Sequence, residues 1–209
     1  MTETTRLTTP IGRLVNGSLF EKDAYKDERG HEATPSYKIE MAFDEVDIEA
    51  LENAVVEAAI AEWGAGAEQD YEDGIIRSPI LEGDDLAKKR QEKGKSGDAY
   101  EGKVVVRAST IYNRHGEDAP GGVYVCDENA KELDFAERGK IYNGCHGIAA
   151  LAPQAYSIDG RKGVTFYLQG FQFVKDGDPL RGVDPSSLFT ATVSAASEGK
   201  GRRRRGGRS

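Results

Sequence analysis

The chain has 209 residues, with 28 Lys and Arg, 36 Asp and Glu, 25 Gly and two Cys. This length suits one domain or two small ones, and a hydrophobic content of 38% is enough to build a core, which excludes a wholly disordered chain. No apolar run is long enough for a membrane helix, the first residues do not form a secretory signal, and two cysteines make no disulfide framework. We therefore expect a folded protein of a reducing compartment, without a membrane partner.

The charge is distributed unevenly along the chain. The last ten residues, 200–209, carry six positive charges and no carboxylate side chain, whereas the whole chain has a net charge of −8. The other 199 residues therefore carry −14. An acidic globule with a basic arm is typical of proteins that bind nucleic acid or another polyanion.

The first half of the chain predicts strands followed by one helix. Short strands are expected over 6–8 and 11–15, and a polar loop over 21–34. Residues 37–43 alternate between apolar and polar side chains, so the odd positions should face the core of a strand. Apolar residues then recur at helical spacing over 46–63, and Gly64 can end that helix. No basic residue lies between Lys38 and Arg77, so this acidic region is either a solvated helix face or a surface that keeps DNA on the opposite side.

The second half predicts mainly strands. Residues 82–102 are charged and Gly-rich and should form a mobile loop, with a short helix over 84–92. Strands are expected over 104–109, 123–126, 140–151 and 163–174. Asp159-Gly160 suits a tight hairpin turn between the last two, and Gly170 indicates a bulge or a close backbone approach.

The order of these elements predicts a mainly β protein. One main helix after the second strand, then antiparallel strands with long loops, fits a five-stranded Greek-key barrel of the OB type best, with a two-sheet sandwich as the alternative. We expect one domain over 1–193 and a disordered, Arg-rich tail over 194–209, because the chain there is rich in Ser, Ala, Gly and Arg.

Motifs for catalysis are weak. Residues 97–103 have the Gly and Lys spacing of a P-loop, but a polar loop precedes them and a β-branched run follows, so no phosphate cradle is expected. Asp84 or Asp85 with Glu101 and Lys103 resembles the carboxylate and Lys set of Mg²⁺-dependent nucleases, which makes such a nuclease the alternative function. The cysteines and histidines have no paired metal-ligand spacing. We expect a binding protein without enzymatic activity, cofactor or metal.

Binding of single-stranded nucleic acid needs aromatic faces for the bases and basic groups for the phosphates. Two groups on or beside the predicted strands have this composition. The first contains Lys103, Arg107, Tyr112 and Arg114, and the second contains Tyr142, His146, Arg161, Lys162 and Tyr167. Lys38 lies on the polar face of its strand and Arg13 on the first strand, and the tail adds Arg202, Arg203, Arg204 and Arg205. For the tyrosines, ordinary core packing is the competing explanation.

Several short segments resemble a family of phage proteins. They are the early Pro-Ile-Gly-Arg-Leu (10–14) and Asn-Gly-Ser-Leu-Phe (16–20), then 35–39, 141–145, 163–168 and 173–177. The chain resembles, over about residues 5–190, the phage single-stranded DNA-binding proteins with an OB fold. This resemblance implies a cytoplasmic protein of the infected cell that coats single-stranded DNA without strong sequence preference during replication or recombination. It also implies that the strand containing Tyr142 belongs to the barrel, near the DNA groove.

The basic tail departs from the acidic tails with which many single-stranded DNA-binding proteins recruit replication proteins. A positive tail should add affinity for single strands and for duplex DNA, or contact the acidic helix. Phage replication or recombination proteins and a second copy of the chain are further candidate partners. A third hypothesis for the function is a structural or adaptor protein whose tail binds RNA or a partner's acidic face.

Overall fold

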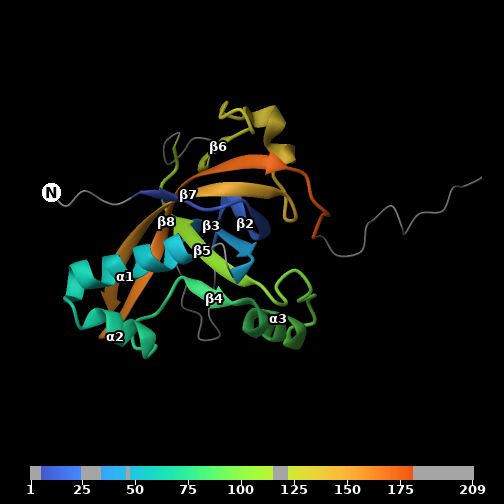
Figure 1. Ribbon diagram of the computed structural model, residues 1–209. Coiled ribbons are helices and arrows are strands. Elements are labelled where there is room, and N and C mark those ends of the chain that lie inside the picture. Colours follow the sequence, from blue (N-terminus) through green and yellow to red (C-terminus); the bar gives the residue numbers. More distant parts are fainter. Residues whose placement is uncertain (1–5, 25–33, 46–47, 115–121, 181–209) are drawn as a thin grey trace, which may run out of the picture.

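A computed structural model describes residues 6–24, 34–45, 48–114 and 122–180 (Figure 1). The structure is mainly β, with three α-helices in the described ranges and a 3-10 helix before the strand His146–Ile158. The strands are β1 (Leu7–Thr8), β2 (Gly12–Asp23), β3 (Ser36–Phe43), β4 (Ile80–Glu82), β5 (Val104–Thr110), β6 (Tyr124–Cys126), β7 (His146–Ile158) and β8 (Arg161–Lys175). The helices are α1 (Glu49–Trp63), α2 (Ala67–Glu72), α3 (Gly83–Glu92) and the 3-10 helix η2 (Phe135–Lys140).

The longer strands pair in a closed cycle. β2 pairs with β3, β3 with β5, β5 with β8, β8 with β7, and β7 with β2. The pairing of β5 with β8 is parallel and the other four are antiparallel. The short strands β1, β4 and β6 extend the sheet at β7, β5 and β8.

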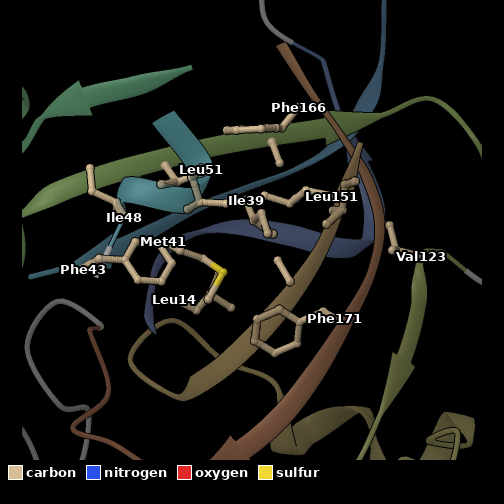
Figure 2. Close-up of a cluster of buried hydrophobic side chains, with 14 of the residues drawn as sticks. Leu14, Ile39, Met41, Phe43, Ile48, Leu51, Val123, Leu151, Phe166 and Phe171 are labelled. Atoms are coloured by element: carbon tan, nitrogen blue, oxygen red, sulfur yellow. The ribbon is translucent and has the colours of Figure 1, made fainter. Parts of the chain in front are cut away.

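Alternating side chains of this cycle build the main core. The predicted inward positions of β3, from Tyr37 to Phe43, are all buried, as are the inward residues of β5 and β8. Figure 2 shows Leu14, Ile39, Met41, Leu151, Phe166 and Phe171 converging, with Ile48 and Leu51 of the α1 region beside them. α1 therefore covers the main core, as its apolar spacing predicts, and it ends at Gly64, where φ is +85°.

A second, smaller cluster lies on the outer face of the strands. Its buried members are Val15, Ala42, Ala87, Tyr100 and Val105. Ala87 belongs to α3, so this cluster holds α3 against the outer face of β2, β3 and β5. Leu180, at the end of the described residues, packs against the same cluster.

Most predicted elements are confirmed, with differences in extent. β2 runs to Asp23, well beyond the predicted 11–15, and α2 and β4 were not predicted at all. The Asp159-Gly160 turn has positive φ at both residues, as a two-residue hairpin turn requires. The pairing of β7 with β8 slips beside Gly170, which confirms the predicted bulge.

The predicted strand over 140–151 is wrong in its first part. Residues 141–145 form a turn region, and β7 begins only at His146. Gly144 has a φ of +121°, and its backbone is in close contact with Asp178, so the chain bends there instead of extending. No helix within the described ranges is long and apolar enough to cross a membrane.

Candidate nucleic-acid interface

One row of residues runs across the outer face of the sheet. Lys38 of β3 lies opposite Ser109 of β5, and Ser109 lies opposite Tyr167 of β8. The row continues on either side to Ser18 of β2 and Ala152 of β7. Residues directly opposite each other point to the same face, so the register alone places Lys38 and Tyr167 on one surface.

The outer face of the β7–β8 hairpin forms a groove of about 510 Å³. We call it the hairpin groove. Its lining is Arg77, Gln154, Tyr156, Ile158, Asp159, Arg161, Thr165 and Tyr167. A Cβ on Gly163 would lie only 2.5 Å from the Tyr156 ring, so that ring lies directly over the glycine. The groove thus combines two tyrosine rings with two arginines, the composition expected for stacking bases and contacting phosphates.

Several of the predicted basic residues are bound to carboxylates. Lys38 Nζ lies 2.5 Å from Asp23 Oδ2, and Lys103 Nζ lies 2.7 Å from Asp44 Oδ1. Arg107 Nε donates to Glu40 Oε1 at 3.0 Å. The Lys38 and Lys103 pairs are exposed, and exposed pairs contribute little stability, so a DNA phosphate can compete for these two cations; Glu40 of the third pair is only 14% exposed.

The first predicted group does not form one cluster. Lys103 lies just before β5, while Tyr112 and Arg114 follow its other end. Arg114 stacks over the Tyr124 ring at 4.7 Å and pairs with Glu132, and Tyr112 is 70% exposed.

Arg107 is the member of this group that shares the outer face with Lys38 and Tyr167. Glu40 and Arg107 lie opposite each other, two residues along the strands from the pair of Lys38 and Ser109, and so point to the same face.

The second predicted group is also divided. His146 and Lys175 pair at one end of the hairpin, whereas Ile158 and Arg161 pair at the other. Only Arg161 and Tyr167 of this group lie together, in the hairpin groove.

Lys162 points away from that groove, because its Nζ contacts Asp70 at 3.3 Å and lies 5.5 Å from the centre of the Trp63 ring. Lys162 therefore fastens the hairpin to α1 and α2.

Tyr142 is not on a barrel strand, contrary to the prediction. Its hydroxyl lies within hydrogen-bonding distance of Asp176 Oδ1 at 3.0 Å and of the Gly177 carbonyl at 2.9 Å, and accepts from the Gly177 N–H at 3.1 Å. The side chain is half-buried against the main core. These contacts use the hydroxyl to hold the segment that follows β8, which is a structural role.

Arg13 and His146 lie beneath that same segment. They face each other between β2 and β7, and Arg13 donates to the Asp178 carbonyl at 2.8 Å. The pKa of His146 is lowered, chiefly by burial and then by Lys175 and Arg13. Arg13 pairs with Ala42, four residues along β3 from Lys38, so it lies at a distance from the row of Lys38 and Tyr167. The predicted tail residues Arg202–Arg205 lie outside the described residues.

Of the residues of the nuclease alternative, Asp84 lies beside Glu101 and Lys103, because its Oδ1 accepts from the Gly102 N–H at 2.8 Å. Glu101 accepts from Gln91 Nε2 at 3.1 Å, and Lys103 is paired with Asp44. Asp85 lies in the first turn of α3, with Lys88 4.0 Å away. In the part of the chain that the structure describes, no three His, Cys, Asp or Glu side chains are grouped to hold a metal ion.

Sequence reasoning missed Arg77 and Tyr156 as candidate binding residues. Tyr156 could have been found from the hairpin turn, because a turn at 159–160 pairs Tyr156 with Gly163 and places it on the face of Tyr167. Arg77 could not have been found from the sequence pattern, because it belongs to a distant segment and reaches the hairpin through an isolated bridge to Gly163.

Comparison with solved structures shows the same fold in phage proteins. The single-stranded DNA-binding protein of bacteriophage Enc34, in a C-terminal truncation, matches with a TM-score of 0.56 and 18% identity, over 83% of this chain and 87% of that one. The Enc34 protein in complex with single-stranded DNA matches with a TM-score of 0.54 and 17% identity, over 84% and 89%. The single-stranded DNA-binding protein gp2.5 of bacteriophage T7 matches with a TM-score of 0.53 and 11% identity, over 93% and 99%.

Sequence comparison identifies the family. No curated protein matches the chain. The profile of one family, described as the single-stranded DNA-binding protein of Enterobacter phage Enc34, matches residues 6–197, which is most of the chain. The protein therefore belongs to the Enc34 family of phage single-stranded DNA-binding proteins.

Proposed function

We propose that the protein coats single-stranded DNA, without strong sequence preference, during phage replication or recombination in the host cytoplasm. The strand lies across the outer face of the sheet, with bases on Tyr156 and Tyr167 of the hairpin groove. Arg77 and Arg161 contact its phosphates there, and Lys38 and Arg107 contact them farther along the row. Base stacking accepts every base, which accounts for the lack of sequence preference.

The observation that carries this proposal is the hairpin groove itself. It gathers Tyr156, Tyr167, Arg77 and Arg161 on one exposed face, although they come from three different parts of the chain. The closed cycle of β2, β3, β5, β8 and β7 supports an OB-type barrel as the scaffold. The acidic α1 covers the main core rather than this face, so its carboxylates do not line the proposed DNA path.

The test is replacement of the tyrosines by alanine. Tyr167→Ala and Tyr156→Ala should each weaken binding to oligo-dT by about 1–3 kcal/mol, because each removes one stacking face. Fluorescence anisotropy measures the affinity, and thermal melting checks that the variants are folded. Tyr112→Ala, which removes a more exposed ring beyond the far end of β5 (70% exposed, against 37% for Tyr167), should leave the affinity unchanged. If Tyr112→Ala weakens binding and the two hairpin variants do not, the DNA follows another path.

A mobility shift with and without Mg²⁺ separates this function from the nuclease alternative. We expect an intact, retarded strand under both conditions. A shortened strand that requires Mg²⁺, and that disappears in Glu101→Ala, would establish the nuclease instead.

A further inference from the structure

A second groove lies on the outer face, between α3 and the strands β3 and β5. We call it the α3 groove, and its volume is about 320 Å³. Its lining is Asn16, Glu40, Leu86, Lys89, Arg90, Lys93, Lys95, Tyr100 and Arg107. Five of these side chains are cations and one is a carboxylate, so the groove has an excess of positive charge in an otherwise acidic protein. Such a concave positive surface concentrates anions.

The lysines of the α3 groove are available to a ligand. Within the described ranges, no carboxylate lies within 4.0 Å of the amino groups of Lys89, Lys93 or Lys95, whereas the neighbouring Lys88 is 4.0 Å from Asp85. Arg90 lies over the Tyr100 ring at 4.7 Å, and its Nε donates to the Ser96 carbonyl. The groove therefore presents three exposed lysines beside two arginines that are held in place.

Glu40 fixes the polar wall of the groove. Its side chain is 14% exposed, and its carboxylate accepts from Asn16 Nδ2 at 3.3 Å, from Tyr100 Oη at 3.0 Å and from Arg107 Nε at 3.0 Å. Burial, with the nearby Glu40 charge, raises the pKa of Tyr100, so its hydroxyl remains protonated and donates. The wall is thus organised before any ligand binds.

The α3 groove opens onto the row that crosses the sheet. Arg107 precedes Ser109 by two residues on β5, and Glu40 follows Lys38 by two residues on β3, so both pairs share the outer face. Arg107 precedes Ser109 on β5, which runs parallel to β8, so it lies back toward the hairpin turn; with strands about 4.8 Å apart and a rise of about 3.3 Å per residue, it is roughly 12 Å from Tyr156 in the plane of the sheet. A strand of several nucleotides, within the range of about 4–16 known for one OB fold, can cover this distance.

We infer that the α3 groove is a phosphate subsite, which binds the backbone of the same DNA strand whose bases stack in the hairpin groove. This inference rests on the proposed function and divides the interface into two parts. The hairpin groove provides stacking beside two arginines, and the α3 groove provides five cations, so the larger share of the salt dependence comes from the α3 groove. An acidic protein segment would also suit the charge. The continuity of the groove with the row favours the DNA backbone.

The experiment measures affinity against strand length and salt, using oligo-dT of 4 to 12 nucleotides. The test variant is Lys89→Gln/Lys93→Gln/Lys95→Gln. The matched control is Lys131→Gln/Lys140→Gln/Lys175→Gln, which removes the same charge from exposed positions that do not line the groove. In the wild-type protein, affinity should rise once a strand is long enough to reach α3. The test variant should lose this rise, bind the longest strand about 10- to 100-fold less tightly, and have a salt slope smaller by up to about two units, since single strands give about 0.7 per contacted phosphate.

The outcomes separate this inference from the proposed function. Tyr167→Ala should weaken binding at every length, including the shortest. If it does not, but the lysine variant still loses the length-dependent rise, the hairpin site is wrong and the phosphate subsite stands. If the lysine variant keeps both the rise and the salt slope, or if the control variant loses them equally, the subsite is wrong. Loss of binding only to a poly-glutamate peptide would likewise overturn it in favour of a protein site. Lys93→Gln alone repeats the test if the triple variant melts early.

Discussion

The helices α1 and α3 cover different parts of the same sheet and are held there in different ways. α1 buries Leu51, Ala54, Val55 and Ala59 against the main core, whereas α3 buries only Gly83 and Ala87. Their charges are also opposite. Residues 49–72, from α1 to α2, contain seven carboxylates and no basic residue, while residues 83–95 contain five basic residues and three carboxylates. The region with the greater share of the core thus carries the charge that repels DNA, and the lightly packed α3 carries the charge that attracts it.

The largest expected effect tests the difference in packing. Leu51→Ala removes a side chain that is 1% exposed, so it should lower the free energy of unfolding by about 2–5 kcal/mol. Leu86→Ala, the matched change in the half-buried part of α3, should cost only about 1 kcal/mol, because less apolar area leaves water. Urea denaturation followed by circular dichroism measures both. Equal losses would show that α3 contributes as much to the core as α1.

The next effect tests how closely the start of α3 approaches the sheet. A Cβ on Gly83 would lie 2.1 Å from the Tyr100 carbonyl oxygen, so Gly83→Ala must displace α3 and should cost about 1–3 kcal/mol. The matched change is Gly66→Ala, before α2. A Cβ added there would have no group of another segment within 4 Å, and φ at Gly66 is −69°. That variant should be neutral or slightly stabilised. Thermal melting compares them, and a harmless Gly83→Ala would show that α3 adjusts freely.

The smallest effect concerns the lysine that ties the acidic region to the hairpin. Lys162→Gln removes the contacts with Asp70 and Trp63 and should cost about 0.5–1 kcal/mol, since both contacts are partly exposed. Its affinity for oligo-dT should remain that of the wild-type protein, because Lys162 does not line either groove. A marked loss of DNA binding with normal stability would show that Lys162 contacts the DNA.

The sequence predicted the parts of the fold that depend on local pattern. The alternation over 37–43, the helical spacing before Gly64 and the Asp159-Gly160 turn each led to a confirmed element. The mainly β class is confirmed as well, while the five-stranded OB barrel remains a proposal supported by the strand pairing. α2 was missed because its six residues are too few for a periodic signal.

The candidate site was less predictable, because it depends on contacts between distant segments. Residue type alone makes Arg107 and Tyr167 candidates for DNA binding. Only their register with Ser109 shows that both lie on the outer face of the sheet. Tyr142 was assigned to a strand, since nothing local to it reveals its contacts with Asp176 and Gly177. The sequence around α3 predicts a charged loop with a short helix, and the groove that its lysines line forms only where α3 lies against β3 and β5.

The parallel pairing of β5 with β8 has a consequence for the order of folding. It joins Ala108 to Phe166 and Ser109 to Tyr167, residues far apart in the chain, whereas β7 and β8 are joined by a two-residue turn. Local hairpins form early and contacts between distant residues form late. Tyr156 and Tyr167 should therefore be brought together before the row that links them to Lys38 exists. Pulse-labelling hydrogen exchange during refolding should accordingly show the amides of the β7–β8 hairpin protected before those of β5.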